Sequence, residues 1–289
     1  MSKLIIAGGS LIAANSKLLG IRSYLSEELR VDQIPQAGFS LRRINKSYTG
    51  PIIEVYDPAT DTATDIYTNK ETISKEYLLS LVDGNGDLFV RKWYDQYNAG
   101  YYIDFSVSSN LPKIISTGSF YLYGNNPRSF GLYLGECDNY FDYYFQNMLT
   151  LAIYKVYLAI SQLNRNSALI RFPEFRGEPY FLIQQGNDVK FNDDTSTLAS
   201  FTPPSDALLF TLNVNLDRGD TKIDIYTAAT VTPDLSTAAT DFKLFRLNPY
   251  LDSTAFQSIL HEIIVAEEAN ISASSNNVFK NQDNYFFKE

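Results

Sequence analysis

The chain has 289 residues and carries 24 Lys and Arg against 33 Asp and Glu, which gives a formal net charge of −9 at pH 7. This acidic balance argues against nucleic acid as a direct partner, because phosphate binding needs clustered Lys and Arg. No apolar run reaches the ~18 residues that cross a bilayer, so we predict no membrane insertion. The 21 Tyr and 19 Phe residues favour a sheet-rich protein, since aromatic side chains fit pleated surfaces.

Residues 1–36 differ in pattern from the rest of the chain. Apolar residues recur there at roughly helical spacing, at Leu18, Ile21, Leu25 and Leu29. This apolar stripe packs either on its own domain or, as an N-terminal arm, on another subunit. Pro35 and Gly38 mark the boundary. We therefore predict an anchoring arm over 1–36 and one domain over 37–289.

The predicted domain begins with a strand and a short helix. The alternating segment PIIEVYD, 51–57, predicts the strand. The helix is expected within TISKEYLLSLVDGNG, 72–86, with Thr72 as its N-cap and Gly84 at its end. The predicted buried face of this helix consists of Ile73, Tyr77, Leu78 and Leu81.

The segment DLFVRKWYDQ, 87–96, predicts the next strand. Simple alternation gives two mixed faces, so we expect both to be covered. These faces are Leu88, Val90 and Lys92 on one side and Phe89, Arg91 and Trp93 on the other. Asp95 and Gln96 end the strand and can bond nearby backbone amides, which would fix the turn that follows.

Two interpretations of this segment stay open. In the first, Trp93-Tyr94-Asp95-Gln96 is structural, with Trp93 and Tyr94 on opposite faces of the strand. In the second, Trp93, Tyr94 and Asp95 form a glycan-binding site. Arg42 and Arg43 likewise either pair with carboxylates such as Asp95 or hold a ligand.

Short strands then recur to the C-terminus, with Gly, Pro, Asn and Asp between them. This pattern is typical of an all-β sandwich or jelly roll. The segments are PKIIS, SFGLYLG, TLAIYKVYLAIS, SALIRF, PYFLIQQGN, ALLFTLNVNL, TKIDIYTA, FKLFRLN and SILHEIIVAEE.

Cys137 is the single cysteine, so the chain has no internal disulfide. We expect Cys137 to be a small buried side chain rather than a nucleophile, and the chain to be made in a reducing compartment. Its neighbours Glu136, Asp138 and Asp142 form an acidic cluster. Glycoside cleavage uses two carboxyl groups, but among so many acidic residues we interpret this cluster as a solvated turn.

Other residues that could carry chemistry are assigned structural roles. His261 lies in an alternating strand without a G-x-S-x-G motif, so we expect a structural histidine. The segment DGNGD, 83–87, begins like a calcium loop but has Leu88 at position six and Tyr94 at position twelve, so we interpret it as a helix stop and turn. We assign no metal ligand and no cofactor; a calcium site elsewhere stays open without assigned residues.

Two blocks of the sequence resemble a known enzyme family. Ser40-Leu41-Arg42-Arg43, Tyr48-Thr49-Gly50-Pro51 and Thr64-Asp65-Ile66 resemble the opening of the catalytic domain of the arabinofuranosidase B family. Gly86-Asp87, Phe89-Val90 and Trp93-Tyr94-Asp95-Gln96 resemble its second block. The same blocks are similar to those of many predicted phage virion proteins, where they precede a concanavalin A-like (laminin-G-like) fold.

The later sequence extends the resemblance from about Gly38 to the C-terminus. The segments FQSILHEIIVAEEANIS and NQDNYFFKE resemble the closing strand and terminal helix of such domains. The resemblance implies an all-β, concanavalin A-like two-sheet jelly-roll sandwich with an N-terminal arm and one or two short helices. The family's cysteine pair and its Met-Glu nucleophile segment have no counterpart here, so we assign no catalytic residue.

The residues and the resemblance lead to three functional hypotheses. The first is a non-enzymatic structural component of a phage virion, made in the host cytoplasm, that contacts other virion proteins through the arm and forms a homo-oligomer. The second, compatible with it, is a glycan-binding module for host surface glycans. The third is a divergent arabinofuranosidase-like glycosidase.

Overall fold

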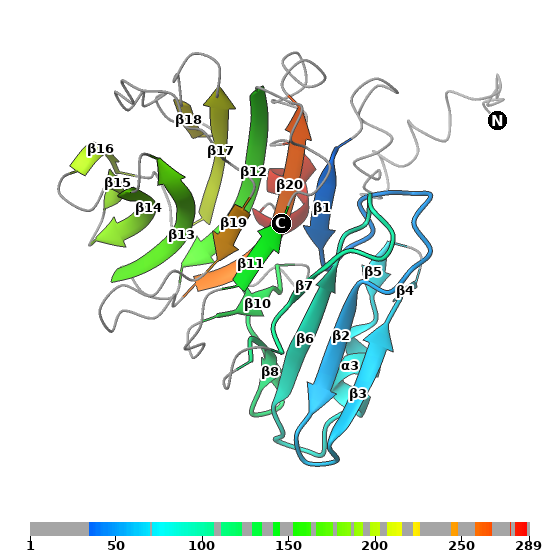
Figure 1. Ribbon diagram of the computed structural model, residues 1–289. Coiled ribbons are helices and arrows are strands. Elements are labelled where there is room, and N and C mark those ends of the chain that lie inside the picture. Colours follow the sequence, from blue (N-terminus) through cyan, green and yellow to red (C-terminus); the bar gives the residue numbers. More distant parts are fainter. Residues whose placement is uncertain are drawn as a thin grey trace, which may run out of the picture.

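A computed structural model shows a protein built almost entirely from antiparallel strands, which confirms the predicted all-β class (Figure 1). The structure describes residues 35–69, 71–106, 111–122, 129–134, 141–144, 153–162, 166–175, 178–185, 188–192, 197–202, 207–215, 222–225, 244–247, 258–267, 278 and 281–287.

The larger sheet has twelve strands, and its main path runs in the order β18-β17-β12-β20-β10-β8-β6-β2-β3. Three further strands pair at its sides, β1 with β20, β7 with β6 and β9 with β8. The strands are β1 (Ala37–Ser40), β2 (Ile53–Asp57), β3 (Thr62–Ile66), β6 (Leu88–Tyr94), β7 (Tyr102–Asp104), β8 (Lys113–Ser116), β9 (Ser119–Phe120), β10 (Leu132–Tyr133), β12 (Ile153–Gln162), β17 (Ala207–Asn215), β18 (Lys222–Ile225) and β20 (Ser258–Glu267).

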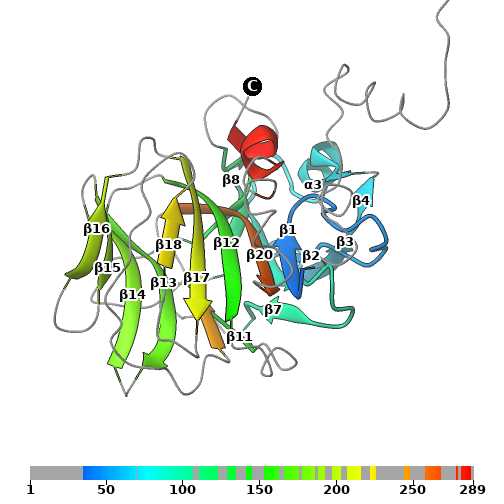
Figure 2. The same ribbon diagram turned by 90° about the horizontal axis from the view of Figure 1, so that it is seen from above.

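The second sheet has six strands in the order β11-β19-β13-β14-β15-β16. Figures 1 and 2 show β13 to β16 on the side of β17 and β18, while β2, β3 and β6 lie at the opposite end of the molecule. The strands are β11 (Phe141–Tyr144), β13 (Asn166–Phe175), β14 (Glu178–Gln185), β15 (Asp188–Asn192), β16 (Thr197–Phe201) and β19 (Leu244–Leu247). A small separate ladder joins β4 (Thr68–Asn69) and β5 (Thr72–Ile73).

Strand β20 lies inside the larger sheet, paired with β12 on one side and with β1 and β10 on the other. Its side chains from Ile259 to Ala266 are all buried, as expected for a strand covered on both faces. Pairing with β12 shifts register there, and His261 is the extra, bulged residue. Because of this bulge, His261 and Glu262 do not simply alternate between faces.

A second bulge, in β6, changes which of its side chains share a face. Opposite β2, Glu54 faces Lys92 whereas Val55 faces Val90, so Arg91 is the extra residue. The bulge reverses the alternation, and Trp93 returns to the side on which Val90 lies. The prediction that Lys92 shares a face with Val90, and that Trp93 lies on the opposite face, is therefore wrong. The fully buried residues are Leu88, Val90 and Trp93; the half-buried ones are Phe89, Arg91, Lys92 and Tyr94.

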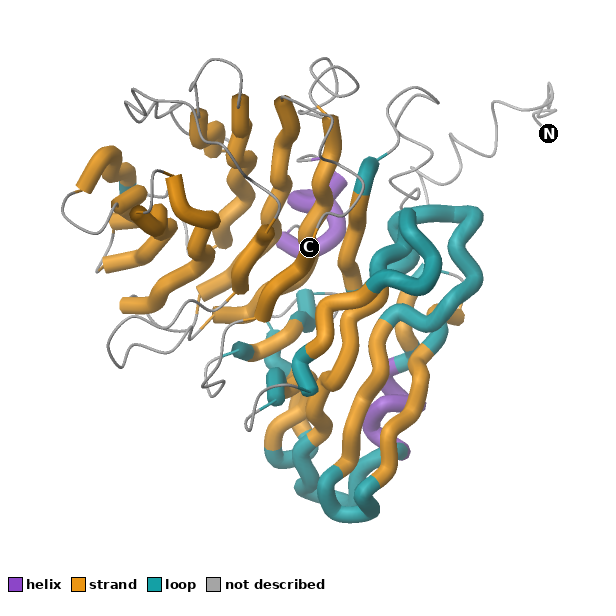
Figure 3. Tube along the Cα trace, viewed as in Figure 1, coloured by secondary structure: helices purple, strands orange, loops and turns teal. Residues whose placement is uncertain are grey.

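Helix α3 (Lys75–Ser80) lies beside β2 and β3 (Figures 1 and 3). Its N-cap is Ser74, whose Oγ accepts a hydrogen bond from the Tyr77 N–H at 3.1 Å. The predicted cap, Thr72, is wrong because that residue belongs to β5. Leu78 is buried as predicted, but Tyr77 is 46% exposed.

The C-terminal helical segment, 281–287, ends in the π-helix η1 (Asp283–Phe287) and covers part of the larger sheet. Its rings Tyr285 and Phe286 complete a buried cluster with Tyr157 and Ala159 of β12, with Ile264 and Ala266 of β20, and with Ile44 and Val278. The closing strand and terminal helix implied by the resemblance are thus both present. No helix in the described part of the chain has the length and apolar character needed to cross a membrane.

We predict that Gly131→Ala destabilises the contact between β10 and β20. A Cβ at Gly131 would lie 2.5 Å from Cγ2 of Ile259 and 2.7 Å from the backbone oxygen of Leu260. Because backbone cannot yield as a flexible side chain does, we expect the free energy of unfolding to fall by about 2–3 kcal/mol. Urea denaturation, followed by fluorescence of the single Trp, measures this loss.

Gly86→Ala is the matched control for this prediction. The nearest atom to a Cβ at Gly86 is 3.3 Å away, on the Val82 side chain. We expect that variant to lose less than ~1 kcal/mol. Equal losses in the two variants would contradict the packing argument.

Candidate functional site

The segment Ser40–Arg43 meets strand β20 in the interior, at a buried ion pair. Arg42 Nε donates to Glu262 Oε2 at 2.9 Å, and Arg42 Nη2 donates to Glu262 Oε1 at 3.1 Å. Ser40 Oγ donates to the same Oε2 at 2.8 Å. The side chains of Arg42 and Glu262 are 3% and 0% exposed. This two-point geometry is the strong form of an arginine–carboxylate contact.

The C-terminal helix closes this ion pair. Arg42 Nη2 also donates to Asn281 Oδ1. The guanidinium lies over the rings of Tyr285 and Phe286, 4.5 Å and 5.5 Å from their centroids. We call Ser40, Arg42, Glu262 and Asn281 the buried polar cluster. The predicted pairing of Arg42 with a carboxylate is confirmed, and that carboxylate belongs to Glu262.

The Asp95 carboxylate accepts hydrogen bonds from backbone N–H groups. Its Oδ1 accepts hydrogen bonds from the N–H groups of Gly38 and Tyr97, both at 2.9 Å. Its Oδ2 accepts a hydrogen bond from Asn98 Nδ2 at 2.8 Å. The predicted role of Asp95 in fixing the following turn is confirmed.

The Gln96 side chain likewise binds the backbone of the segment from 40 to 44. Its Oε1 accepts a hydrogen bond from Ile44 N–H at 2.8 Å, and its Nε2 donates to the Arg42 carbonyl at 2.7 Å and the Ser40 carbonyl at 3.2 Å. The end of β6 therefore binds the chain from 38 to 44, which positions Arg42. The two blocks that carry the family resemblance form one structural unit.

Burial corrects two of the three proposed glycan contacts. Trp93 is 0% exposed and packs against Phe39 with ring centroids 5.8 Å apart. Its Nε1 has no hydrogen-bond partner among the described residues. Asp95 is also 0% exposed. Neither side chain can stack on or bond to a sugar in this fold, so their assignment as glycan contacts is wrong.

Tyr94 is half-buried and lies on the face of the sheet opposite to that of Trp93, which we call the outer face. Its hydroxyl donates to Asp65 Oδ1 at 2.9 Å, and its ring meets Tyr102 edge-on with centroids 5.7 Å apart. Burial raises the pKa of Tyr94, and the hydrogen bond to Asp65 raises it further. Beside these rings, Lys92 Nζ lies 2.8 Å from Glu54 Oε2 and 5.3 Å from the Tyr102 centroid.

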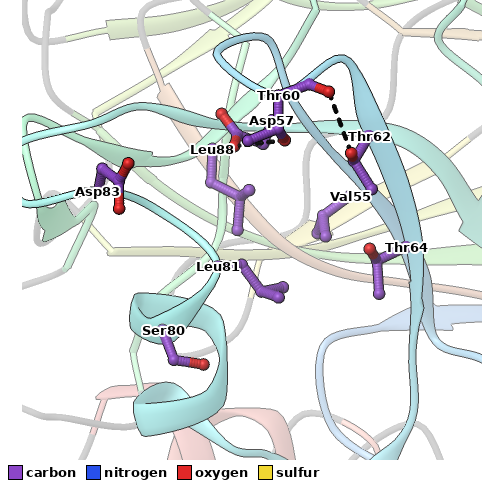
Figure 4. A pocket seen from close by; sticks show the side chains of 9 residues that line it. All are labelled: Val55, Asp57, Thr60, Thr62, Thr64, Ser80, Leu81, Asp83 and Leu88. Carbon is purple, nitrogen blue, oxygen red and sulfur yellow. Dashed lines mark hydrogen bonds between the residues drawn. The ribbon is translucent and has the colours of Figure 1, made fainter.

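A pocket of about 320 Å³ lies on the other face, between the β2–β3 hairpin and the end of α3 (Figure 4). Across the strands Val55 faces Thr64 and Asp57 faces Thr62, so these four side chains share one side of the hairpin. The full lining is Val55, Asp57, Thr60, Thr62, Thr64, Ser80, Leu81, Asp83 and Leu88. Its hydroxyl and carboxylate groups make the lining partly polar.

Several polar groups of the pocket already have intramolecular partners. Asp57 Oδ1 accepts from Ala59 N–H at 3.0 Å, and Asp57 Oδ2 accepts from Thr60 Oγ1 at 2.8 Å. Ser80 Oγ donates to the Tyr77 carbonyl at 2.7 Å. Sequence analysis missed this pocket, although threonines at alternating positions of a strand signal a polar inner face.

His261 and Ser161 form a second buried polar contact. Ser161 Oγ lies 2.8 Å from His261 Nε2, and His261 Nδ1 lies 3.3 Å from the Phe130 carbonyl. Both side chains are 0% exposed. The third group is a carbonyl rather than a carboxylate, and substrate has no access, so the contact is structural, as predicted. Burial lowers the pKa of His261 to about 4.

Other predicted site residues lie outside the described residues. These are the arm residues Leu18, Ile21, Leu25 and Leu29, together with Glu136, Cys137 and Asp138. Asp142 belongs to β11, but its side chain is not among those described. The 83–87 segment forms the predicted turn, with Gly86 N–H donating to the Asp83 carbonyl at 3.0 Å. Within the described residues, no group of three His, Cys, Asp or Glu could hold a metal ion.

Comparison with known proteins bears on the fold. No family model and no curated protein matches the chain. An arabinofuranosidase complexed with arabinofuranosyl-alpha-1,2-xylobiose is similar in structure, with a TM-score of 0.63 and 12% identity, over 88% of this chain and 63% of that one. This chain has the fold of that enzyme.

Two further structures agree. A GH54 α-L-arabinofuranosidase soaked with a cyclic sulfate inhibitor gives a TM-score of 0.62 at 11% identity. A mutant GH54 α-L-arabinofuranosidase soaked with 4-nitrophenyl α-L-arabinofuranoside gives 0.61 at 12%. The chain spans 63% of the length of each. Identity this low shows a shared fold alone.

We predict that Glu262→Gln destabilises the protein by about 3–5 kcal/mol, because it leaves the buried Arg42 charge without its counter-ion. The matched control is Glu54→Gln, which breaks the Glu54–Lys92 pair on the outer face, where these side chains are 17% and 27% exposed. We expect this control to cost less than ~1 kcal/mol. Urea denaturation of both variants measures the difference, and similar costs would contradict a central role for the buried pair.

We predict that His261 makes stability fall as pH drops from about 6.5 towards 4. The folded pKa, about 4, lies below the ordinary value of 6.5, so the unfolded chain binds a proton in this range that the folded chain does not. The contribution of neutral His261 to the free energy of unfolding is fully present above the pKa of the unfolded state. It amounts to about 3 kcal/mol, and it is lost as the pH falls through the folded pKa.

His261 is the only histidine, so its imidazole NMR signals identify it without ambiguity. We expect them to titrate below pH 5 in the folded protein and near 6.5 in urea. The variant His261→Gln should lose this part of the pH dependence. A folded-state titration near 6.5 would disprove the assignment of a buried neutral imidazole.

Proposed function

We propose that this chain is a non-enzymatic structural component of a phage virion, such as a capsid decoration, head fibre or tail protein. The observation that carries the proposal is the use of the resemblance blocks inside the fold. Arg42 bonds Glu262, Asp95 and Gln96 bond backbone, and all four side chains are buried. These residues maintain a scaffold and are not available to a substrate.

The same geometry argues against the glycosidase hypothesis for these residues. Glycoside cleavage needs two carboxyl groups that reach the bond from opposite sides. Asp95 and Glu262, the carboxylates that hold the segment from 38 to 42 in place, are both 0% exposed. Their oxygens accept hydrogen bonds from within the protein. The shared fold therefore supports inheritance of the scaffold and gives no reason to transfer the reaction.

The virion assignment rests on the sequence blocks that resemble predicted phage virion proteins. In this proposal the β-sandwich is the presented domain, and residues 1–36 contact other virion proteins through the stripe Leu18, Ile21, Leu25 and Leu29. An apolar stripe that only a partner buries is a typical assembly element. The chain is made in the host cytoplasm and forms a homo-oligomer within the particle.

We predict that deletion of residues 1–36 abolishes incorporation into particles while the domain still folds. Particles assembled with the variant are purified, and the protein is quantified by mass spectrometry relative to a coat protein. A variant with Ile21→Asp and Leu25→Asp tests the stripe alone and should reduce incorporation at least tenfold. The matched control changes Ser23→Asp in the same segment. Normal incorporation of the deletion variant would contradict the proposed arm.

Glycan binding is the second candidate, and it is compatible with the first. It is favoured by exposed aromatic rings at the end of β3 and on β7, with Tyr67 55% and Tyr102 40% exposed. Tyrosine rings offer apolar surface with a polar hydroxyl, a combination common at binding surfaces. Screening the full chain against immobilised polysaccharides tests this candidate.

A further inference from the structure

Three tyrosines form a row across one end of the outer sheet face. Tyr94 on β6 faces Tyr102 on β7 in the strand register. The backbone bonds from Tyr94 N–H to Ile52 O and from Ile52 N–H to Ile66 O continue the row through Ile52, which is 0% exposed, to Tyr67, the residue after β3. With strands about 4.8 Å apart, Tyr67 and Tyr102 are separated by roughly 14 Å. We call Tyr67, Tyr94 and Tyr102 the tyrosine row.

The middle of this row is held in place before any ligand arrives. Tyr94 is fixed by its hydrogen bond to Asp65 and by its edge contact with the Tyr102 ring. Lys92 Nζ lies 5.3 Å from the Tyr102 centroid, which restrains that ring from the other side. Ordered side chains lose little conformational entropy on binding, so a fixed aromatic row suits recognition.

A charged row lies directly beside the tyrosines. The register places Asp65 opposite Glu54, Glu54 opposite Lys92, and Lys92 opposite Asp104. This row therefore holds three carboxylates and one ammonium, and two of the carboxylates, Glu54 and Asp104, lie opposite Lys92. The three carboxylates supply hydrogen-bond acceptors next to apolar ring faces, while their excess negative charge repels polyanions.

We propose that the tyrosine row binds a neutral glycan chain laid across the strands. The rings contact the C–H faces of sugars at separate points along the glycan chain, and the carboxylates of Asp65, Glu54 and Asp104 accept hydrogen bonds from sugar hydroxyls. Uronic-acid or sialylated chains are disfavoured by the same carboxylates. This inference deepens the glycan-binding candidate and rests on it.

The test uses the full chain and a panel of neutral polysaccharides, a xylan, a mannan and a glucan, with polygalacturonate as the anionic probe. Binding is measured by affinity gel electrophoresis and, for the retained polysaccharide, by calorimetry. Tyr67→Ala and Tyr102→Ala should each weaken binding about fivefold to tenfold, whereas Tyr102→Phe keeps the ring and should bind nearly as the native protein does.

Tyr77→Ala is the matched control, because Tyr77 is 46% exposed on α3, away from the row. It should leave binding unchanged. Retention of a neutral polysaccharide with the predicted losses supports the row. Retention that Tyr67→Ala and Tyr102→Ala do not weaken overturns the row but leaves glycan binding standing. Failure to retain any neutral polysaccharide overturns both, and tighter binding of polygalacturonate overturns the proposed preference for neutral chains.

Discussion

The bidentate pair between Arg42 and Glu262 is the interaction on which the rest of the structure depends. The two residues lie 220 positions apart, so their contact joins the start of the domain to the last long strand. Two charges removed from water are tolerated only with good geometry and with their remaining polar atoms satisfied. Ser40 donates a hydrogen bond to Glu262, and Asn281 accepts one from Arg42. The segment that follows β1, strand β20 and the C-terminal helix therefore stabilise one another.

This constraint gives the residues of the two resemblance blocks a structural role in the fold. Asp95 and Gln96 hold the backbone from 38 to 44, and that backbone presents Arg42 to Glu262. The likeness in structure to arabinofuranosidases, with a TM-score of 0.63 at 12% identity, is what a shared scaffold produces. Function then depends on surfaces, and the tyrosine row is the surface on which we base the binding proposal.

Local patterns predicted much of the fold but failed where strands are bulged. Alternation correctly gave β2, whose side chains are buried at every second position, and short apolar segments between turn residues correctly gave β8, β12 and β20. In β6 an extra residue at Arg91 reverses the faces, which buries the predicted sugar contact Trp93. A bulge has no reliable signal in one sequence, since it arises from pairing with a particular neighbour. The polar pocket was missed for a similar reason, because its lining joins a hairpin to a helix end.

The sequence by itself determined the all-β class, the turn at 83–87 and the structural role of His261, and it gave backbone bonding as the role of Gln96 and as one of two roles open to Asp95. Such features follow from propensity, periodicity and local hydrogen bonding, which act over a few residues. Only the tertiary structure decided that Glu262 is the partner of Arg42 and that Tyr67, Tyr94 and Tyr102 form one row. These groups come together through strand register across the sheet, and register depends on non-local pairing that no short stretch of sequence encodes.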